Sequence, residues 1–448
     1  MDTKTKANNA FAFSILTTLF FMWGFFTVLN DVLIPHLKSI FELTHFMAML
    51  VQFAFFGAYF IGSLIYFIVS ASFGDPINKI GYKGGIILGL GLSALGSGLF
   101  YPATIVGQYW FYLMALFIVG LGFTILQIAA NPYVAILGSP QTASSRLNLA
   151  QGFNSLGTTI GPIIGGYLIF HYFAGESAVK IPYLIYAVIF LFLAAVIFSV
   201  KLPQVTNPEE KVEGFGALKH QNLILGVVAI FMYVGAEVSI GSILISFLGL
   251  DEIAGLSDVD ASQYLSYYWG GLMIGRFLGA VSLSEMKNYS VKILLMLGIP
   301  LVAFIVISLL AGIKIASIYS IFLVLNLLAF YFGKSKSSRT LMLFSIVIIA
   351  LLLVALGFNG SIAMWAVIGI GLFNSIMWSN IFTLAIDGLG KYTSQGSSML
   401  VMAILGGAII PPIQGALADS IGVHLSFIVP VFSYAYLAFY GWRFSRQS

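Results

Sequence analysis

Long apolar stretches recur from one end of the chain to the other, and no polar segment between them reaches the size of a soluble domain. Of the 448 residues, 60% are hydrophobic and only 8% are charged, whereas a soluble domain carries roughly 25% charged residues. A membrane-spanning helix needs about 20 mostly apolar residues. The pattern therefore predicts an all-α polytopic membrane protein with lipid around it, and it excludes a soluble enzyme or a nucleic-acid-binding protein.

Hydropathy predicts fourteen spans, and the basic residues orient them. Sixteen of the 20 Lys and Arg fall in connections that are cytoplasmic if the N-terminus is inside, three fall outside, and Arg276 lies within a span. Cytoplasmic loops are enriched in Lys and Arg, so both termini are expected in the cytoplasm. The predicted spans are 11–36, 46–73, 84–102, 108–137, 147–172, 181–200, 221–248, 263–283, 290–312, 315–332, 340–358, 361–387, 396–418 and 424–444.

Four matches in the same order indicate an internal repeat. The run Val119-Gly-Leu-Gly122 precedes Asn131 by nine residues, as Ile368-Gly-Ile-Gly371 precedes Asn380. The glycine stripe at 157, 161 and 165 has its counterpart in Gly407, Pro411 and Gly415, and glycines 57 and 62 match glycines 270 and 275. Parallel repeats are a transporter architecture. We expect an N-terminal six-helix bundle at 1–200, a cytoplasmic linker at 201–220, and a C-terminal bundle at 221–448 with a two-helix insertion near 310–358.

One carboxylate, Asp31, lies inside the first apolar stretch, with Asn30 beside it. An acid at the centre of a membrane helix costs about 2.5–3.5 kcal/mol on insertion scales, and such residues usually lie on a polar path through the bundle. Asp31 and Asn30 are therefore candidates for coupling solute movement to an ion. Because Pro35 follows, the alternative is a hydrated acid near the end of a helix.

Amide side chains cluster in the fourth and fifth predicted spans. Gln127 and Asn131 are four residues apart, and Gln151 and Asn154 are three apart, so each pair shares a helix face. Pro132 deprives a carbonyl one turn earlier of its hydrogen bond, which can line a cavity. Neutral amides offer donors and acceptors to a polyhydroxylated solute. The alternative is that they hydrogen-bond neighbouring helices together.

The second half contributes Glu237, near the centre of the seventh span, and Arg276, in the inner half of the eighth. Either they form a structural ion pair, or Glu237 lies on the solute path and Arg276 gates it. Aromatic faces such as Trp23 and Trp378 would stack on a sugar ring, and Asn374 and Asn380 are further candidates to bind the solute. With neither an ATP-binding motif nor cysteine in the sequence, we expect an ion gradient to drive transport without a cofactor.

Several segments together resemble the fucose/glucose/galactose sugar:cation symporters of the major facilitator superfamily, over nearly the whole chain except the insertion. They are Trp23-Gly24, Leu29-Asn-Asp31, Ala129-Ala-Asn-Pro-Tyr133, Arg146-Leu-Asn-Leu-Ala-Gln151, Phe153-Asn154, Tyr233-Val-Gly-Ala-Glu237 and Gly371-Leu-Phe-Asn-Ser375. The resemblance implies two six-helix bundles around a sugar site that opens alternately to each side. It also implies that Asp31 is the ion-coupled acid and that Gln151 and Asn154 contact the sugar.

One position departs from the proton-coupled members, which carry glutamate where this chain has Gln127. Glutamine cannot carry a proton, but its oxygen can bind a hard cation beside a carboxylate. The sequence thus favours Na+ over H+, held by Asp31 and Gln127, in a monomeric symporter of glucose, galactose, fructose, fucose or an N-acetylhexosamine. The alternatives are a proton-coupled drug or metabolite antiporter, which the amides disfavour, and a sugar sensor, which would need a larger soluble region.

Overall fold

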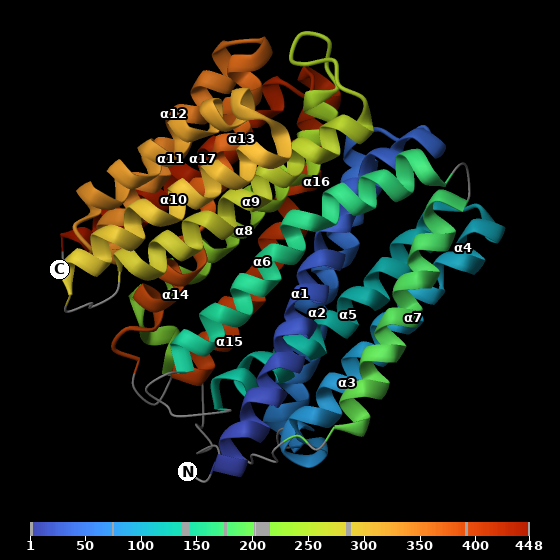
Figure 1. Ribbon diagram of the computed structural model, residues 1–448. Helices are drawn as coiled ribbons and strands as arrows, with labels where there is room; N and C mark the ends of the chain where they lie inside the picture. Colours follow the sequence, from blue (N-terminus) through green and yellow to red (C-terminus); the bar gives the residue numbers. More distant parts are fainter. Residues whose placement is uncertain are drawn as a thin grey trace. The chain divides into compact units, whose positions relative to one another are not determined.

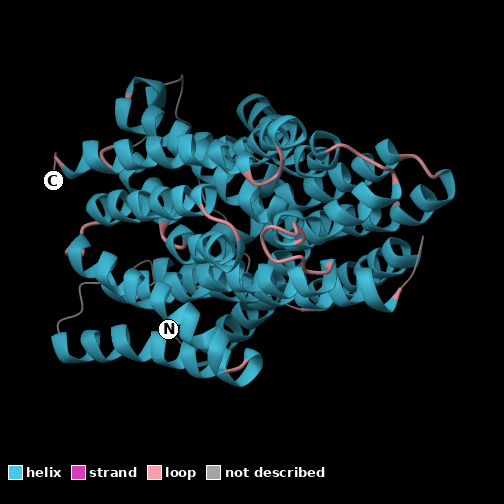
Figure 2. Cartoon of the chain, turned by 90° about the horizontal axis from the view of Figure 1, so that it is seen from above, coloured by secondary structure: helices cyan, strands magenta, loops and turns pink. Residues whose placement is uncertain are grey.

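The structure is a computed structural model that describes residues 3–73, 76–136, 143–173, 177–200, 202, 216–283, 288–389 and 393–446. Within these residues every regular element is a helix, and Figure 2 shows helices joined by short loops. The chain divides into two compact units, Met1–Gly214 and Phe215–Ser448. Most of the predicted linker at 201–220 lies outside the described residues.

The first unit consists of long helices connected by short turns (Figure 1). Its first helix continues through Pro35, so the predicted end at residue 36 falls four residues short. The elements are α1 (Thr3–Ile40), α2 (His45–Phe73), α3 (Pro76–Gly98), α4 (Phe100–Val106), α5 (Tyr109–Ile136), α6 (Ala143–Gly166), the π-helix η2 (Tyr167–Tyr172) and α7 (Ser177–Ser199).

The second unit contains more helices, and two of its predicted spans are broken. Segment 361–387 separates into α13 and α14 directly after Asn374, and segment 396–418 is interrupted by a 3-10 turn. The elements are η3 (Gly216–Lys219), α8 (Gln221–Leu248), α9 (Asp258–Ser282), α10 (Tyr289–Ala311), α11 (Ile313–Gly333), α12 (Ser337–Gly357), α13 (Gly360–Asn374), α14 (Met377–Ile386), α15 (Thr393–Met402), η5 (Ala403–Leu405), α16 (Gly406–Ile421), η6 (Leu425–Phe427) and α17 (Ile428–Ser445).

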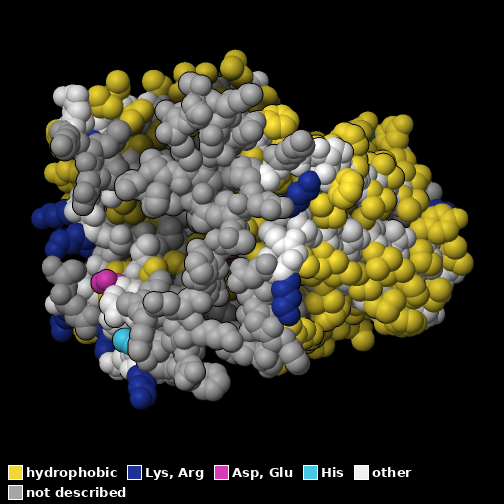
Figure 3. All heavy atoms as spheres, turned by 90° about the horizontal axis from the view of Figure 1, so that it is seen from below, with side chains coloured by type: hydrophobic (Ala, Val, Ile, Leu, Met, Phe, Trp, Pro, Cys, Tyr) yellow, Lys and Arg dark blue, Asp and Glu magenta, His cyan; other side chains and the backbone are white. Residues whose placement is uncertain are grey.

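Twelve helical segments among the described residues are long and apolar enough to cross a membrane, whereas the sequence predicts fourteen. The two remaining predicted spans correspond to α6 and α9, which are 24 and 25 residues long. Neither helix is among the twelve apolar segments, and both carry polar residues: α6 has amide side chains and α9 has Arg276. Elsewhere the surface is apolar: Leu309 and Leu310 of α10 are 80% and 83% exposed, and Figure 3 shows hydrophobic side chains over much of one face.

Glycine allows several helix pairs to approach until their backbones touch, and one such pair in each unit involves the glycines of the repeat region. In the first unit α1 packs on α6, and a Cβ at Gly157 would overlap the carbonyl oxygen of Phe21. In the second unit α8 packs on α16, and a Cβ at Gly406 would overlap the carbonyl oxygen of Phe231. Small residues are the usual means of close helix packing in membranes. We refer to these two contacts as the α1–α6 seam and the α8–α16 seam.

The remaining helix contacts also correspond between the units. In the first unit α5 packs on α2 and α3, and α3 packs on α7; in the second, α13 packs on α9 and α12, and α12 packs on α17. This correspondence pairs α12 with α3 and leaves α10 and α11 without counterparts. By this correspondence α10 and α11, at Tyr289–Gly333, have no counterpart in the first unit, whereas the sequence predicts the insertion near 310–358.

Candidate functional site

The carboxylate of Asp31 is almost completely buried and is paired with an amide of the neighbouring helix. Gln52 of α2 donates a hydrogen bond from Nε2 to Oδ1 of Asp31 over 2.8 Å, and each residue is 2% exposed. A buried charge without a hydrogen-bond donor is very costly, so this amide stabilises the carboxylate. Gln52 is absent from the candidates named from sequence, although an amide inside an apolar span is itself a signal.

A second polar pair joins the same two helices two turns away. Trp23 of α1 donates its indole N–H to the hydroxyl of Tyr59 on α2 over 3.2 Å. Trp23 is eight residues before Asp31 and Tyr59 is seven residues after Gln52, as expected for antiparallel helices. At about 1.5 Å of rise per residue, the two pairs lie about 12 Å apart along α1. The polar contacts between α1 and α2 therefore extend over about two turns of these helices.

Asn154 of α6 lies at the level of Trp23. Its amide donates from Nδ2 to the carbonyl oxygen of Phe20 over 3.0 Å. A Cβ at Gly24 would overlap the backbone carbonyl oxygen of Asn154. The α1–α6 seam therefore places Asn154 at the level of Trp23, which is itself buried and hydrogen-bonded to Tyr59 of α2.

The other predicted amides of this unit remain accessible. Gln127 and Asn131 on α5 and Gln151 on α6 are partly exposed, in contrast to the buried Asp31. The helices α5 and α6 contact one another. The side chain of Pro132 lies outside the part of the chain that the structure describes. Gln127 and Gln151 thus keep hydrogen-bonding surface available on two adjacent helices, whereas Oδ1 of Asn131 is buried and has no hydrogen-bond partner among the described residues.

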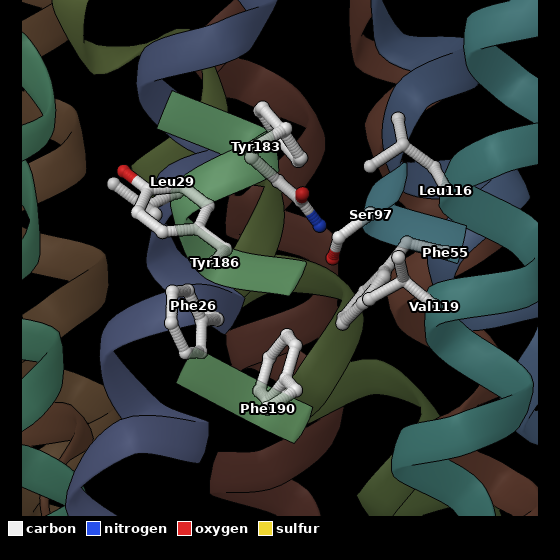
Figure 4. Close-up of a pocket in the computed structure, with 10 residues that line it drawn as sticks. Phe26, Leu29, Phe55, Ser97, Leu116, Val119, Tyr183, Tyr186 and Phe190 are labelled. Atoms are coloured by element: carbon white, nitrogen blue, oxygen red, sulfur yellow. The ribbon is translucent and has the colours of Figure 1, made fainter. Parts of the chain in front are cut away.

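Asn30 is buried in a different environment from Asp31. It is 2% exposed and lines a cavity with room for about one water molecule. Its Nδ2 has no hydrogen-bond partner among the described residues. Figure 4 shows Phe26 and Tyr186 on one side of this cavity and Ser97 and Val119 on the other. We call it the Asn30 cavity; apart from Asn30 and Ser97 its lining is aromatic and aliphatic.

In the second unit the carboxylate is Glu237, which is partly buried on α8. Tyr233, one turn earlier, donates its hydroxyl hydrogen to Oε2 of Glu237. Tyr268 of α9 donates to the backbone oxygen of Glu237 over 3.0 Å. The charge of Arg276, also on α9, acts electrostatically on the carboxylate. Glu237 is therefore held in place through its side chain and its backbone.

Asn374 extends this arrangement to two more helices. Its Nδ2 donates to the hydroxyl of Tyr268 over 2.9 Å, and its Oδ1 accepts from the hydroxyl of Tyr434 on α17 over 2.6 Å. Asn374 is completely buried at the end of α13, where the helix breaks. A chain of hydrogen bonds therefore runs from Tyr434 through Asn374 and Tyr268 to the backbone of Glu237. We call it the tyrosine chain. Sequence reasoning missed its tyrosines, because nothing distinguishes them among 22.

The two remaining candidates lie on α14 and differ in accessibility. Trp378 is partly exposed and stacks on Phe382, with ring centroids 6.2 Å apart. Asn380 is 2% exposed and donates to the backbone oxygen of Ser337 on α12 over 3.1 Å. Trp378 therefore presents an aromatic face, while Asn380 holds two helices together.

Neither unit contains a preformed metal cluster: the described residues include no group of three or more His, Cys, Asp or Glu side chains that could hold a metal ion. The predicted cation ligands Asp31 and Gln127 lie on different helices, α1 and α5, which contact one another. The described hydrogen bond of Asp31 goes to Gln52. The ion-coupling candidates are thus one buried carboxylate with an amide partner and one partly exposed amide.

A bundle of apolar helices with buried acids, accessible amides and broken helices is typical of membrane transporters. The family model of the Major Facilitator Superfamily matches residues 13–333. This chain belongs to that superfamily, and within it to the group that holds the glucose/galactose transporters and the fucose symporters. The match confirms the resemblance stated from the sequence motifs.

The relatives cover almost the whole chain. A glucose/galactose transporter of Brucella abortus is 44% identical over 98% of this chain and 95% of its own length. The L-fucose-proton symporter of Escherichia coli is 30% identical over 97% and 93%. The crystal structure of the transporter FucP in the outward conformation covers 98% of this chain and 99% of its own, with a TM-score of 0.66 and 29% identity.

These relatives are transporters, so the chain is a transporter and not an enzyme. Together with the twelve apolar helical segments, they also make it a multi-pass protein of the bacterial inner membrane.

Proposed function

We propose that this protein is a cation-coupled symporter that accumulates a monosaccharide by alternating access. The observation that carries the proposal is Asp31, a carboxylate that is 2% exposed inside an apolar helix and is hydrogen-bonded by Gln52. An ionisable group that a membrane protein retains at such cost usually lies on an ion or substrate path. The partly exposed amides of α5 and α6 provide the neutral hydrogen-bonding surface that a sugar requires.

The proposed sugar contacts are Trp23, Gln151 and Asn154 in the first unit and Glu237 and Trp378 in the second. Asn131 is a further contact on α5, whereas Asn374 and Asn380 act by holding helices in position, because both are buried and hydrogen-bonded. Glucose and galactose are the proposed substrates, ahead of fructose, fucose and N-acetylhexosamines. The similarity to the glucose/galactose transporter of Brucella abortus supports this order.

Na+ is the proposed coupling ion, with Asp31 and Gln127 as ligands. The oxygen of Gln127 can bind a cation but cannot carry a proton. The competing ion is H+, which the name of the L-fucose-proton symporter supports. Both ions would depend on Asp31, so the choice between them rests on Gln127.

The proposed topology has fourteen spans and cytoplasmic termini. It adds α6 and α9 to the twelve apolar segments, since both helices are long enough to cross a bilayer. Some of their polar residues, Gln151 and Asn154 of α6 and Arg276 of α9, are among those assigned to the site. The additional pair α10–α11 then leaves the orientation of all later helices unchanged. This topology can be tested by accessibility labelling of single introduced cysteines, because the chain has no natural cysteine that would also react.

Uptake by the full-length protein in proteoliposomes tests the proposal. The panel is glucose, galactose, fructose, fucose and N-acetylglucosamine, each offered with an inward Na+ gradient, an inward H+ gradient or neither. We expect glucose or galactose to accumulate with the Na+ gradient. Accumulation with the H+ gradient alone would show that the coupling ion is H+ and not Na+. Uptake that responds to neither gradient would rule out symport.

A further inference from the structure

The partner of Asp31 is an amide, and an amide can bind a carboxyl group in either of its charge states. Gln52 now donates from Nε2 to Oδ1 of Asp31 over 2.8 Å, the arrangement suited to an ionised carboxylate. A glutamine also has an acceptor oxygen on the same planar group. A turn of about 180° about its last torsion exchanges the donor and the acceptor, and that torsion is soft and roughly two-fold.

Burial makes the choice between these two orientations matter. Both residues are 2% exposed, so bulk water cannot replace a lost hydrogen bond. When a proton or Na+ occupies Asp31, an N–H group facing it would repel the added positive charge, whereas the amide oxygen would accept the proton's hydrogen bond or bind the ion. A side chain limited to one of these roles would favour a single charge state of Asp31.

We propose that Gln52 is a positioning residue for cation coupling: its amide donates to the bare carboxylate of Asp31 and turns to present Oε1 when a cation or proton occupies that carboxylate. This inference rests on the proposed function and adds a residue on α2 to the coupling site. It also gives the α1–α2 contact two hydrogen-bonded states that differ only in the orientation of one amide. Sugar binding, on the polar surface near Trp23, does not require the switch.

The test compares Gln52→Met with Gln52→Asn in full-length protein reconstituted in proteoliposomes. Methionine keeps the length of the side chain and removes both hydrogen-bonding groups, while asparagine keeps the amide on a shorter chain. Gln414→Met is the matched control, because Gln414 of α16 is 1% exposed and is hydrogen-bonded to Ser239 and Ser426. It measures the cost of losing a buried amide elsewhere.

Two transport modes are measured with the sugar that the wild type exchanges fastest. Exchange of labelled for unlabelled sugar at equal ion concentrations reports sugar binding and alternation, and gradient-driven accumulation reports coupling. We expect Gln52→Met to lose about tenfold or more in accumulation while its exchange stays close to that of the wild type. Gln52→Asn should recover part of the accumulation. Gln414→Met should keep the wild-type ratio of accumulation to exchange.

Three outcomes would overturn the inference. They are wild-type accumulation by Gln52→Met, loss of exchange and accumulation in equal proportion, or a change in their ratio in Gln414→Met as large as that in Gln52→Met. The proposed function fails in a different way, when the wild type exchanges none of the five sugars. The two failures are therefore distinguishable in the same preparation.

Discussion

The two units share their backbone packing but differ in the polar groups that this packing holds. In the α1–α6 seam Gly157 lies against the backbone of Phe21, and in the α8–α16 seam Gly406 lies against the backbone of Phe231. In the first unit Gln52 of α2 hydrogen-bonds Asp31 of α1, whereas in the second unit the tyrosine chain links side chains of three helices to the backbone of Glu237. At these two seam positions a side chain would overlap the neighbouring backbone, so glycine is required in both units. The polar side chains are under no such constraint and differ between the units.

This difference assigns different tasks to the units. A hydrogen bond between an amide and a carboxyl side chain can exchange donor and acceptor, which suits a group that changes its charge state. Hydrogen bonds in a chain polarise and hold one another, which suits a group that must keep one position. The first unit is therefore expected to carry ion coupling through Asp31, and the second to orient the sugar through Glu237.

The largest effect is expected where the two units are alike. Gly157→Leu and Gly406→Leu should each destabilise the protein by about 3 kcal/mol or more, because the new side chain must push two helix backbones apart. The controls are Gly91→Leu and Gly298→Leu, which have open space beside the glycine. Thermal melting in detergent measures the result. Normal melting of either seam variant would show that its seam is not a close contact.

The next effect should separate the two acids. Asp31→Asn should abolish gradient-driven accumulation and leave sugar exchange measurable, because it removes only the charge at the coupling position. Glu237→Gln should instead raise the KM for exchange about tenfold, since a hydrogen bond to a charged group contributes about 1.5–3 kcal/mol. Its gradient-driven accumulation at saturating sugar should remain at the wild-type level. Proteoliposome assays of both variants decide the matter, and the assignment of tasks fails if the two variants behave alike.

A smaller effect should reveal the tyrosine chain. Tyr268→Phe and Tyr434→Phe each remove one hydroxyl that bonds to Asn374. Their destabilisations should be non-additive by about 1 kcal/mol, because the two hydroxyls share one amide. Tyr59→Phe combined with Tyr434→Phe is the control, since these residues belong to different units and should be additive. Unfolding measured for the single and double variants gives the coupling directly; additivity of the first pair would contradict a continuous chain.

The helices could be predicted from the sequence because each is a long apolar segment whose composition is visible locally. Asp31 and the amides stood out for the same reason, as polar residues in apolar surroundings. The partners could not be predicted, because Gln52 meets Asp31 only through the packing of α2 on α1. The break after Asn374 also has no local signal, since neither Pro nor Gly follows Gly371 before Met377.

The insertion shows how an inference from length can be displaced by packing. Spacing between repeated motifs correctly indicates that the second half is longer, but it cannot say which helices are additional. The contacts of α12 with α13 and α17 repeat those of α3 with α5 and α7. That correspondence, which is three-dimensional, leaves α10 and α11 as the additional pair.

The smallest effect tests whether Asn30 belongs with Asp31, as their adjacency in sequence suggests. Neighbouring residues on a helix point about 100° apart, and Asn30 faces the apolar Asn30 cavity while Asp31 faces Gln52. Asn30→Leu removes a buried Nδ2 that has no partner among the described residues. It should therefore stabilise the protein by about 1 kcal/mol and leave the ratio of accumulation to exchange unchanged.

Asn30→Asp is the companion variant, because it places a second carboxylate in the same apolar surroundings and should destabilise the protein. Melting temperature and the two transport modes are measured for both variants. If Asn30→Leu lost accumulation while keeping exchange, Asn30 would belong to the ion site together with Asp31. The two side chains would then share a function although they point in different directions from the helix. If it melted lower with coupling intact, its amide would hold the bundle together without taking part in transport.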